Sequence, residues 1–178
     1  MKKKRKVSAR PAEHRRFRTR RASLKDLELL VQHRRGMWSD MKVGESPELD
    51  VADRAYRIWA RQRLKNGSLL GWIVEDGRGC VAGSGCLWLR PVQPFPGSTG
   101  PVEPYLLSMY THPGFRHQGV ASLVVKSAAD WCKRGEYPLM RLHASRMGRD
   151  LYKQLGFERS WEMRLRLKNG STRRKKRA

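Results

Sequence analysis

Apolar residues near the start of the chain recur at the spacing of a helix. Over residues 24–31 they follow Ser23, a residue type that caps helices, and they predict a helix that ends near Gly36. A second apolar stripe predicts a helix that begins at about residue 50 and is closed by Asn66–Gly67. Ahead of both helices, a weak alternation over residues 14–22 predicts a first strand.

The period then changes to that of a sheet. Residues 69–75 and 80–89 predict two strands, and the Asp-Gly-Arg-Gly sequence between them favours a hairpin. Residues 91–104 contain five prolines and two glycines, which exclude a central strand and favour an irregular loop. A loop of this length in a compact domain is often functional. Residues 105–111 are apolar on both alternating faces, as expected of a strand that is covered on both sides.

The last part of the chain alternates helices and strands. Helical spacing predicts a helix over residues 120–134, and residues 137–144 follow as a strand. A short helix over residues 148–155 is stopped by Gly156, and alternating apolar residues from Trp161 to Leu167 predict a final strand. This order of elements predicts a mixed α/β domain.

Charge is concentrated at the two ends of the chain. The 178 residues include 39 Lys and Arg and 16 Asp and Glu, which gives a net charge of +23. Residues 1–22 carry +10 and residues 168–178 carry +6. We therefore predict a basic arm over residues 1–13, a domain over 14–167 and a basic tail over 168–178. Such ends attract polyanions, including non-specific nucleic acid, with an affinity that falls as salt rises.

Composition also limits the compartment and the class of protein. Hydrophobic residues make up 39% of the chain, which excludes a wholly disordered protein, and no apolar run could span a bilayer. We expect a cytoplasmic protein without a membrane partner, or a nuclear one if the string KKKRKV at residues 2–7 acts as an import signal. The cysteines Cys80, Cys86 and Cys132 lack C-x-x-C spacing, so we expect neither a disulfide framework nor a metal site.

The candidate chemistry lies where the strand over residues 105–111 leads into the next helix. A helix start presents unpaired backbone N–H groups and the positive end of the helix dipole, which suit a pyrophosphate. Gly119 has no Cβ to block close approach, and Ala121 keeps the first turn thin. Arg116 and His117 add donors or positive charge.

These residues resemble a motif of the GCN5-related N-acetyltransferase (GNAT) superfamily. Its acetyl-CoA motif, Q/R-x-x-G-x-G/A, is matched by Arg116, Gly119 and Ala121. Residues 144–157 end in Leu-Tyr-Lys-Gln-Leu-Gly-Phe and are similar to the family's second motif. The resemblance covers roughly residues 15–167 and implies an α+β fold, with a mixed, mostly antiparallel sheet of about six or seven strands. About four helices would flank the sheet, and its fourth strand would splay from the fifth.

The resemblance implies an acetyl-CoA-dependent N-acetyltransferase in which a primary amine attacks the thioester directly. The groups that would hold acetyl-CoA belong to Met109, Tyr110, Thr111, Arg116, His117, Gln118, Gly119, Val120, Ala121, Ser122 and Ser145. The N–H of Met109 would stabilise the oxyanion, and Tyr152 would protonate the departing thiolate as general acid. Alternatively, Tyr152 is a core aromatic residue. The base is not readable from the sequence, and Glu103 is the nearest candidate by position.

The acceptor would be the amine of a small molecule, protein or peptide. Trp38, Met41 and Tyr56 would line its pocket between the first two helices and the proline-rich loop, or would simply pack on the sheet. The fold does not choose among amines, and homodimers are common for it. The basic body disfavours a polycationic acceptor. An alternative function is a nucleic-acid- or ribosome-associated protein that uses its basic ends, although the intact acetyl-CoA motif argues against this.

Overall fold

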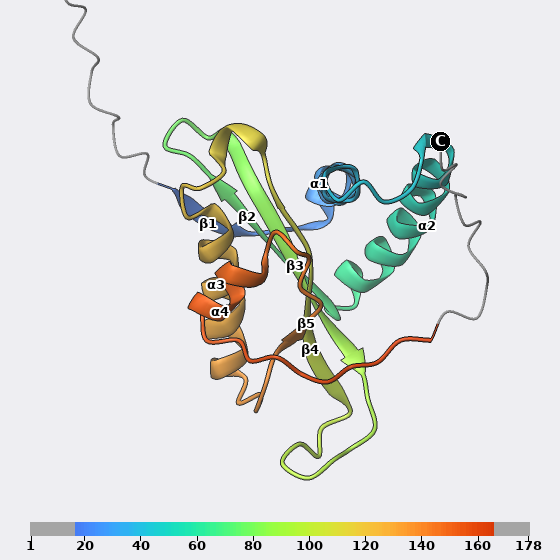
Figure 1. The fold of residues 1–178 in the computed structure, drawn as a ribbon, viewed down its shortest axis with the longest axis vertical. Coiled ribbons are helices and arrows are strands. Elements are labelled where there is room, and N and C mark those ends of the chain that lie inside the picture. The colour runs from blue at the N-terminus through green and yellow to red at the C-terminus, as the bar shows by residue number, and fades with distance from the viewer. Residues whose placement is uncertain (1–16, 166–178) are drawn as a thin grey trace, which may run out of the picture.

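The computed structural model describes residues 17–165, which form one central sheet with helices on both faces (Figure 1). The strands, in their order across the sheet, are β1 (Arg18–Arg21), β2 (Leu69–Glu75), β3 (Val81–Pro91), β4 (Val102–Thr111) and β5 (Arg141–Leu142). The first four strands pair antiparallel, and β5 joins β4 in parallel. The predicted arms over residues 1–13 and 168–178 lie outside the described residues.

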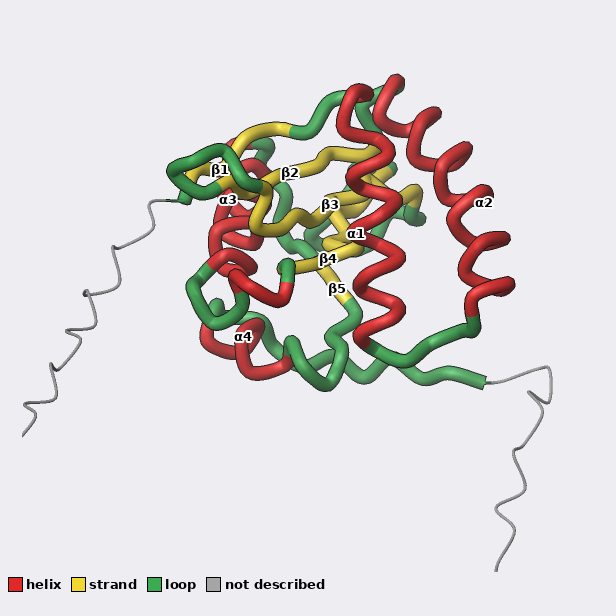
Figure 2. The backbone as a smooth tube through the Cα atoms, turned by 90° about the horizontal axis from the view of Figure 1, so that it is seen from above, coloured by secondary structure: helices red, strands yellow, loops and turns green. Residues whose placement is uncertain are grey.

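Two pairs of helices cover the sheet. The helices are α1 (Leu27–Asp40), α2 (Ser46–Lys65), α3 (Val120–Arg134) and α4 (Arg149–Gln154). The first pair lies on one face and the second pair on the other (Figure 2). Side chains alternate along each strand, so two buried clusters form. One lies between the sheet and α3 and includes Val74 and Val124, and the other lies beneath α1 and α2 and includes Leu30 and Cys86.

Both helices of the first pair are longer than the sequence pattern predicts. We predict an end near Gly36, but α1 continues to Asp40. Gly36 is required by packing, because a Cβ at this position would lie 2.6 Å from a ring carbon of Tyr110. Similarly, α2 begins at Ser46, with Pro47 in its first turn, where a missing N–H costs no helical hydrogen bond.

The proline-rich loop is shorter than predicted. β3 runs to Pro91 and β4 begins at Val102. Pro104 is therefore buried inside a central strand, whereas the composition predicts a loop at this position. This placement is tolerated because β5 pairs with β4 only from Tyr105 onward. A proline at this point therefore removes no hydrogen bond to the neighbouring strand β5.

The sheet has five strands within residues 17–165, fewer than the resemblance implies. Of the strand predicted over residues 137–144, only Arg141–Leu142 pairs. The predicted final strand is not formed in its described part, residues 161–165, and Leu167 lies outside the described residues. The alternating pattern predicts a strand here, but its described residues pair with no strand of the sheet.

The feature that matters most for function is the separation of β4 from β5. Parallel pairing joins Tyr105–Leu106 to Arg141–Leu142 and then stops. On the other edge of β4, Ser108 and Met109 together face the single residue Gly85, which forms a β-bulge. Beyond this bulge the β5 side of the β4 backbone has no strand partner among the described residues.

Candidate active site

The junction between β4 and α3 gathers backbone donors. His117 and Gly119 both have positive φ, at 61° and 83°. Such changes of backbone conformation turn nearby N–H groups toward one concave side. Gly119 is the N-cap of α3, and no side chain caps this helix. The N–H groups of residues 120–122 therefore have no acceptor within the helix, and they lie at the positive end of its dipole.

The space above this helix start is open. A Cβ built on Gly119 would meet no atom within 4 Å, while the positive φ of this residue disfavours any other residue type. An uncovered set of backbone donors at a helix start fits a pyrophosphate, so the residues present are suited to the diphosphate of acetyl-CoA.

Arg116 is engaged by the protein instead of facing the open space. Its Nη2 donates to Asp40 at 2.5 Å, and its Nε donates to the Thr111 carbonyl at 3.3 Å. The ion pair links the end of α1 to the loop that precedes α3. Gln118 is similarly engaged, because its side-chain amide donates to the Gly114 carbonyl at 3.1 Å. Both side chains shape the loop, so its backbone N–H groups are the donors that remain for a ligand.

The unpaired part of β4 holds three further predicted cofactor residues. Met109 packs against the cluster under α3, whereas the Tyr110 ring lies 4.8 Å from the His33 ring of α1. Their side chains are thus used for packing on opposite faces. On its β5 side this part of β4 has no strand partner among the described residues, so an extended ligand with amides could pair there as an added strand. The Thr111 carbonyl, however, already accepts from Arg116.

A cleft of about 1270 Å³ lies beside β5 and α4, and the segment over residues 157–164 contributes to its wall. Tyr152 lines this cleft, and its ring contacts Phe157 edge-on at 5.6 Å between centroids. Its hydroxyl has no hydrogen-bond partner within the described part of the chain. Burial raises the pKa of Tyr152 above its ordinary value, so its phenol keeps its proton at neutral pH. Ser145 lies at the turn before α4, where its carbonyl accepts from Gly148.

Tyr152 and the splayed strand β4 both contribute side chains to one hydrophobic core. Tyr152 and Met109 pack against the same buried cluster between the sheet and α3. The cleft itself is lined by β5 and α4, and none of the predicted cofactor residues of β4 or the start of α3 contributes to its wall. The structure therefore brings Met109 and Tyr152 to one core, which also contains Val120, the residue that follows Gly119.

Glu103 lies inside β4 and is 4% exposed, whereas the sequence pattern placed it in a loop. Its Oε1 accepts from Arg90 Nη2 at 2.7 Å, and its Oε2 accepts from Arg141 Nε at 2.6 Å. Although burial alone would raise the pKa of Glu103, the hydrogen bonds from both arginines bring it below its ordinary value. A carboxylate held in this way takes up a proton poorly. This geometry opposes the predicted base role and gives Glu103 the task of tying β5 to β4.

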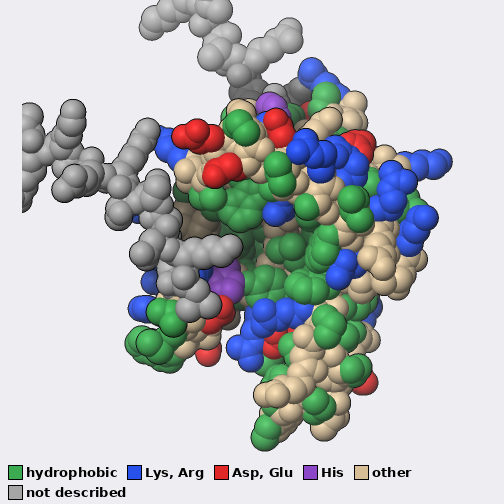
Figure 3. Space-filling view, turned by 90° about the vertical axis from the view of Figure 1, so that its right-hand side faces the viewer, with side chains coloured by type: hydrophobic (Ala, Val, Ile, Leu, Met, Phe, Trp, Pro, Cys, Tyr) green, Lys and Arg blue, Asp and Glu red, His purple; other side chains and the backbone are tan. Residues whose placement is uncertain are grey.

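The predicted acceptor residues differ in exposure. The Arg34 guanidinium lies over the rings of both Trp38, at 5.3 Å, and Tyr56, at 4.6 Å. Tyr56 is only 6% exposed, so it lies beneath the surface and can support an acceptor pocket without lining it. Trp38 and Met41 are half-buried at the end of α1 and can contribute to a surface. Figure 3 looks onto the side of the molecule that bears α1 and α2 and shows a hollow with hydrophobic side chains, with Lys and Arg as well as Asp and Glu around it.

Sequence reasoning missed a buried polar pair beneath α1. His33 is 8% exposed, and its Nδ1 lies 2.8 Å from the Ser84 hydroxyl of β3. Burial lowers the pKa of His33 to about 4, so the ring is neutral at pH 7. The available signal was its spacing, because His33 follows Leu30 by three residues and so continues the buried stripe of α1.

We expect this histidine to make stability depend on pH. In the unfolded chain it binds a proton below pH 6.5, whereas in the folded protein it does so only near pH 4. Between these values the unfolded state holds more protons, so the free energy of unfolding should fall by up to about 3 kcal/mol as pH is lowered. Urea unfolding at pH 7 and pH 4.5 measures this change. His33→Asn should remove most of the difference, and a slope that survives this substitution would assign it to other groups.

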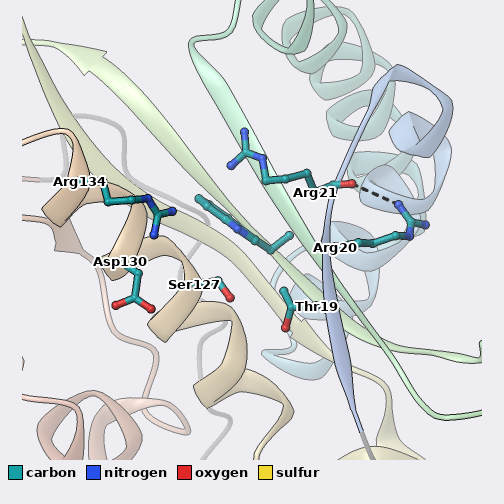
Figure 4. Close-up of a pocket in the computed structure, with 7 residues that line it drawn as sticks. Thr19, Arg20, Arg21, Ser127, Asp130 and Arg134 are labelled. Atoms are coloured by element: carbon teal, nitrogen blue, oxygen red, sulfur yellow. Dashed lines mark hydrogen bonds between the residues drawn. The ribbon is translucent and has the colours of Figure 1, made fainter.

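A second hollow, of about 280 Å³, lies between β1 and α3 (Figure 4). Arg21 lies over the Trp72 ring at 4.5 Å, and Arg20 is turned toward Asp26 and Glu75, which it binds at 2.8 and 2.6 Å. None of the predicted site residues lines this hollow. It is therefore separate from the candidate site.

Other kinds of site can be checked over residues 17–165. No three His, Cys, Asp or Glu side chains there are grouped so that they could hold a metal ion. Cys80, Cys86 and Cys132 are all free thiols, and only Cys80 is exposed. In the same range, no helix has both the length and the apolar character that a membrane span requires.

The combination of a donor-lined helix start, a splayed strand and a cleft tyrosine can be compared with known proteins. The sequence matches the acetyltransferase (GNAT) family over residues 30–157, which is more than two thirds of the chain. The chain belongs to this family. It is an acetyl-CoA-dependent N-acetyltransferase, and the predicted family and fold class are confirmed. No curated protein matches this GNAT chain in sequence.

Solved structures are similar over most of the GNAT domain. A GCN5-related N-acetyltransferase from Ralstonia eutropha is 26% identical, with a TM-score of 0.78, over 85% of this chain and 98% of that chain. A predicted acetyltransferase from Clostridium acetobutylicum, solved with acetyl-CoA, is 25% identical, with a TM-score of 0.77, over 85% and 97%. An aminoglycoside N-acetyltransferase in complex with CoA is 18% identical, with a TM-score of 0.67, over 90% and 99%, and this likeness shows the fold alone.

Proposed function

We propose that this GNAT enzyme transfers an acetyl group to a primary amine by direct attack, with Tyr152 as the general acid. The observation that carries this proposal is the separation of β4 from β5, which leaves the backbone of Met109–Thr111 open just ahead of the start of α3. The open strand and the donor-lined helix start thus follow one another along the chain. Tyr152 is a protonated side chain of the adjacent α4.

The backbone supplies most of the binding groups in this proposal. The N–H groups of residues 117–122 bind the pyrophosphate, aided by the dipole of α3. Backbone groups of Met109 and the N–H of Thr111 pair with the pantetheine amides as a further strand would. Acetyl-CoA supplies an acetyl group that is activated as a thioester.

The chain's own groups then favour the chemical step in two ways. The N–H of Met109 donates to the carbonyl oxygen, where negative charge develops as the neutral amine attacks. The new C–N bond forms while the C–S bond breaks, and the sulfur leaves with the bonding electron pair. Tyr152 gives its phenolic proton to that sulfur and regains a proton when the acetylated nitrogen loses one through water. A phenol suits this task because it is protonated at pH 7, whereas a thiol has a pKa of about 8.5.

The amine reaches the site from the face that bears α1 and α2. The opposite face of the sheet is covered by α3 and α4 (Figure 2). On the α1 side, Trp38 and Met41 are half-exposed side chains next to the ion pair of Asp40 and Arg116. These groups form an acceptor wall that is mainly apolar.

The proposal is tested with the full chain, acetyl-CoA and a panel of primary amines. A thiol reagent follows the release of CoA, and mass spectrometry identifies the N-acetyl product. We expect thiol release that depends on the amine. Failure to bind acetyl-CoA by calorimetry, or thiol release at the same rate without any amine, would contradict it.

A further inference from the structure

Arg34 of α1 is a cation whose guanidinium makes no hydrogen bond to the described protein. It lies over the Tyr56 ring at 4.6 Å and near the Trp38 ring at 5.3 Å, and its Nη1 is buried without a partner. Burial also lowers the pKa of Arg34 below its ordinary value. Contacts with two rings fix the plane of the guanidinium but leave its fork of N–H donors unused.

A second unsatisfied polar atom lies on the facing helix α2. The side chain of Asp53 is 9% exposed, and its Oδ2 accepts from Arg35 at 2.7 Å. Its other oxygen, Oδ1, is buried without a hydrogen-bond partner. Arg34 and Asp53 are close enough to interact electrostatically, yet no hydrogen bond joins them. Buried polar groups without hydrogen-bond partners are costly, and here two of opposite charge lie on facing helices. This arrangement indicates a site where a polar ligand supplies the missing hydrogen bonds.

The neighbouring carboxylates each have a partner other than Arg34, although Asp53 keeps one unpaired oxygen. The ion pairs on α1 and α2 join Glu28 to Arg57, Asp40 to Arg116, and both Asp50 and Asp53 to Arg35. The remaining two, Glu45 and Glu48, form the capping box at the start of α2. Within the described residues of these helices, Arg34 is therefore a positive charge in an aromatic setting that no carboxylate hydrogen-bonds.

Arg34 is also close to the reacting centre. The Tyr56 ring that it covers has its hydroxyl 4.0 Å from the Cys86 thiol of β3. Cys86 pairs with Leu107, which precedes Ser108, the residue of positive φ in the β4 bulge. Met109, whose N–H faces the developing charge in the proposed mechanism, follows Ser108 directly. The Tyr56 side chain thus connects the Arg34 guanidinium to the part of β3 and β4 that carries the bulge.

We propose that Arg34 binds an oxyanion of the acceptor, so that the preferred amine carries a carboxylate or a phosphate. This inference rests on the proposed function and names its substrate class. A carboxylate or phosphate oxygen accepts from the unused N–H groups of Arg34, and the aromatic rings hold the guanidinium in place. Asp53 Oδ1 accepts from a donor group of the same acceptor. Polycationic amines, in contrast, would meet an uncompensated positive charge.

The test compares matched acceptors with the full chain and its Arg34→Gln variant. Phenylalanine and phenylalaninamide differ in the carboxylate, and phosphoethanolamine and ethanolamine differ in the phosphate. We expect the variant to raise KM about tenfold or more for the anionic member of the effective pair, with kcat within about twofold. The neutral member should change little. Each acceptor is compared between variants, so differences in amine pKa cancel, and the pair that responds identifies the oxyanion.

Arg63→Gln is the matched control. Arg63 also stacks on aromatic rings, those of Trp59 and Trp88, but its Nη1 already donates to the Trp59 carbonyl. Loss of a structural cation–π contact would affect both variants alike and would raise KM for charged and neutral acceptors together. Equal effects on both members of each pair, or no effect of Arg34→Gln on either, would overturn the inference.

Binding of a product analogue gives a second reading that needs no turnover. Calorimetry with N-acetylphenylalanine and with its amide, on wild type and Arg34→Gln, should show a loss of affinity of about tenfold for the acid alone. N-acetylphosphoethanolamine and N-acetylethanolamine are compared in the same way for the phosphate. Equal affinities of wild type within both pairs would overturn the inference even if amines are acetylated. Failure of acetyl-CoA to bind would instead overturn the proposed function, while this measurement still decides the role of Arg34.

Discussion

Replacing Gly119 with glutamate is expected to abolish the binding of acetyl-CoA, with Kd rising about a hundredfold or more. The new side chain would enter the open space above the start of α3 and set a negative charge where a pyrophosphate binds. It would also strain the backbone, because φ at this position is 83°. Isothermal titration calorimetry of wild type and variant measures the effect.

Gly67→Glu is the matched control, because it introduces the same charge and a similar backbone strain at a position away from the start of α3. Gly67 has a φ of 76°, and a Cβ there would also meet no atom within 4 Å. It follows the end of α2, away from the start of α3. We expect Gly67→Glu to bind acetyl-CoA within about twofold of wild type, since surface substitutions usually have small effects. Equal losses in both variants would contradict a pyrophosphate site at Gly119.

The elements that the sequence predicts well are those with strong local signals. The stripe of apolar residues in α3 and the glycine ahead of it fix the start of that helix at Val120, as the structure confirms. The turn between β2 and β3 is equally local, and Asp76 closes it with a backbone hydrogen bond to Cys80. In both cases the residues that determine the structure are close together in the sequence.

The errors arise where a distant residue decides. Gly36 signals a helix end in the sequence, yet the ring of Tyr110 from β4 accounts for it. Pro104 signals a loop, yet the limited pairing of β5 lets it stand in a central strand. Alternation alone likewise predicts a strand at residue 161, although the described residues there pair with no strand of the sheet. None of these partners can be read from local spacing.

The same distinction holds for the site. Gly119 could be proposed from the sequence because a helix start can bind anions through its backbone, which depends only on local sequence. Arg34 and His33 were missed because their roles depend on which face of α1 meets the sheet and on what is left unpaired there. The geometry opposes a base role for Glu103 because Arg90 and Arg141, from two other strands, bind it, and these partners could not be predicted from its position in the sequence.

Tyr152→Phe is expected to lower kcat about a hundredfold or more, while the KM for acetyl-CoA stays within about twofold. The phenylalanine ring keeps the contact with Phe157 and removes only the hydroxyl, which has no hydrogen-bond partner in the described protein. Tyr137→Phe is the matched control, because this ring packs against the same buried cluster and stacks on Trp131. If Tyr152 were only a core aromatic, the two variants would have similar activity.

The pH dependence separates Tyr152 from any other acid. A general acid must be protonated to act, and burial raises the pKa of Tyr152 above the ordinary value of 10. The kcat of wild type should therefore not decrease up to pH 9 through deprotonation of the general acid, since the phenol remains protonated throughout. An acid of lower pKa, such as a histidine or a thiol, would lose its proton within this range and kcat would fall. A decline of kcat below pH 9 that persists in Tyr152→Phe would thus assign the proton to another group.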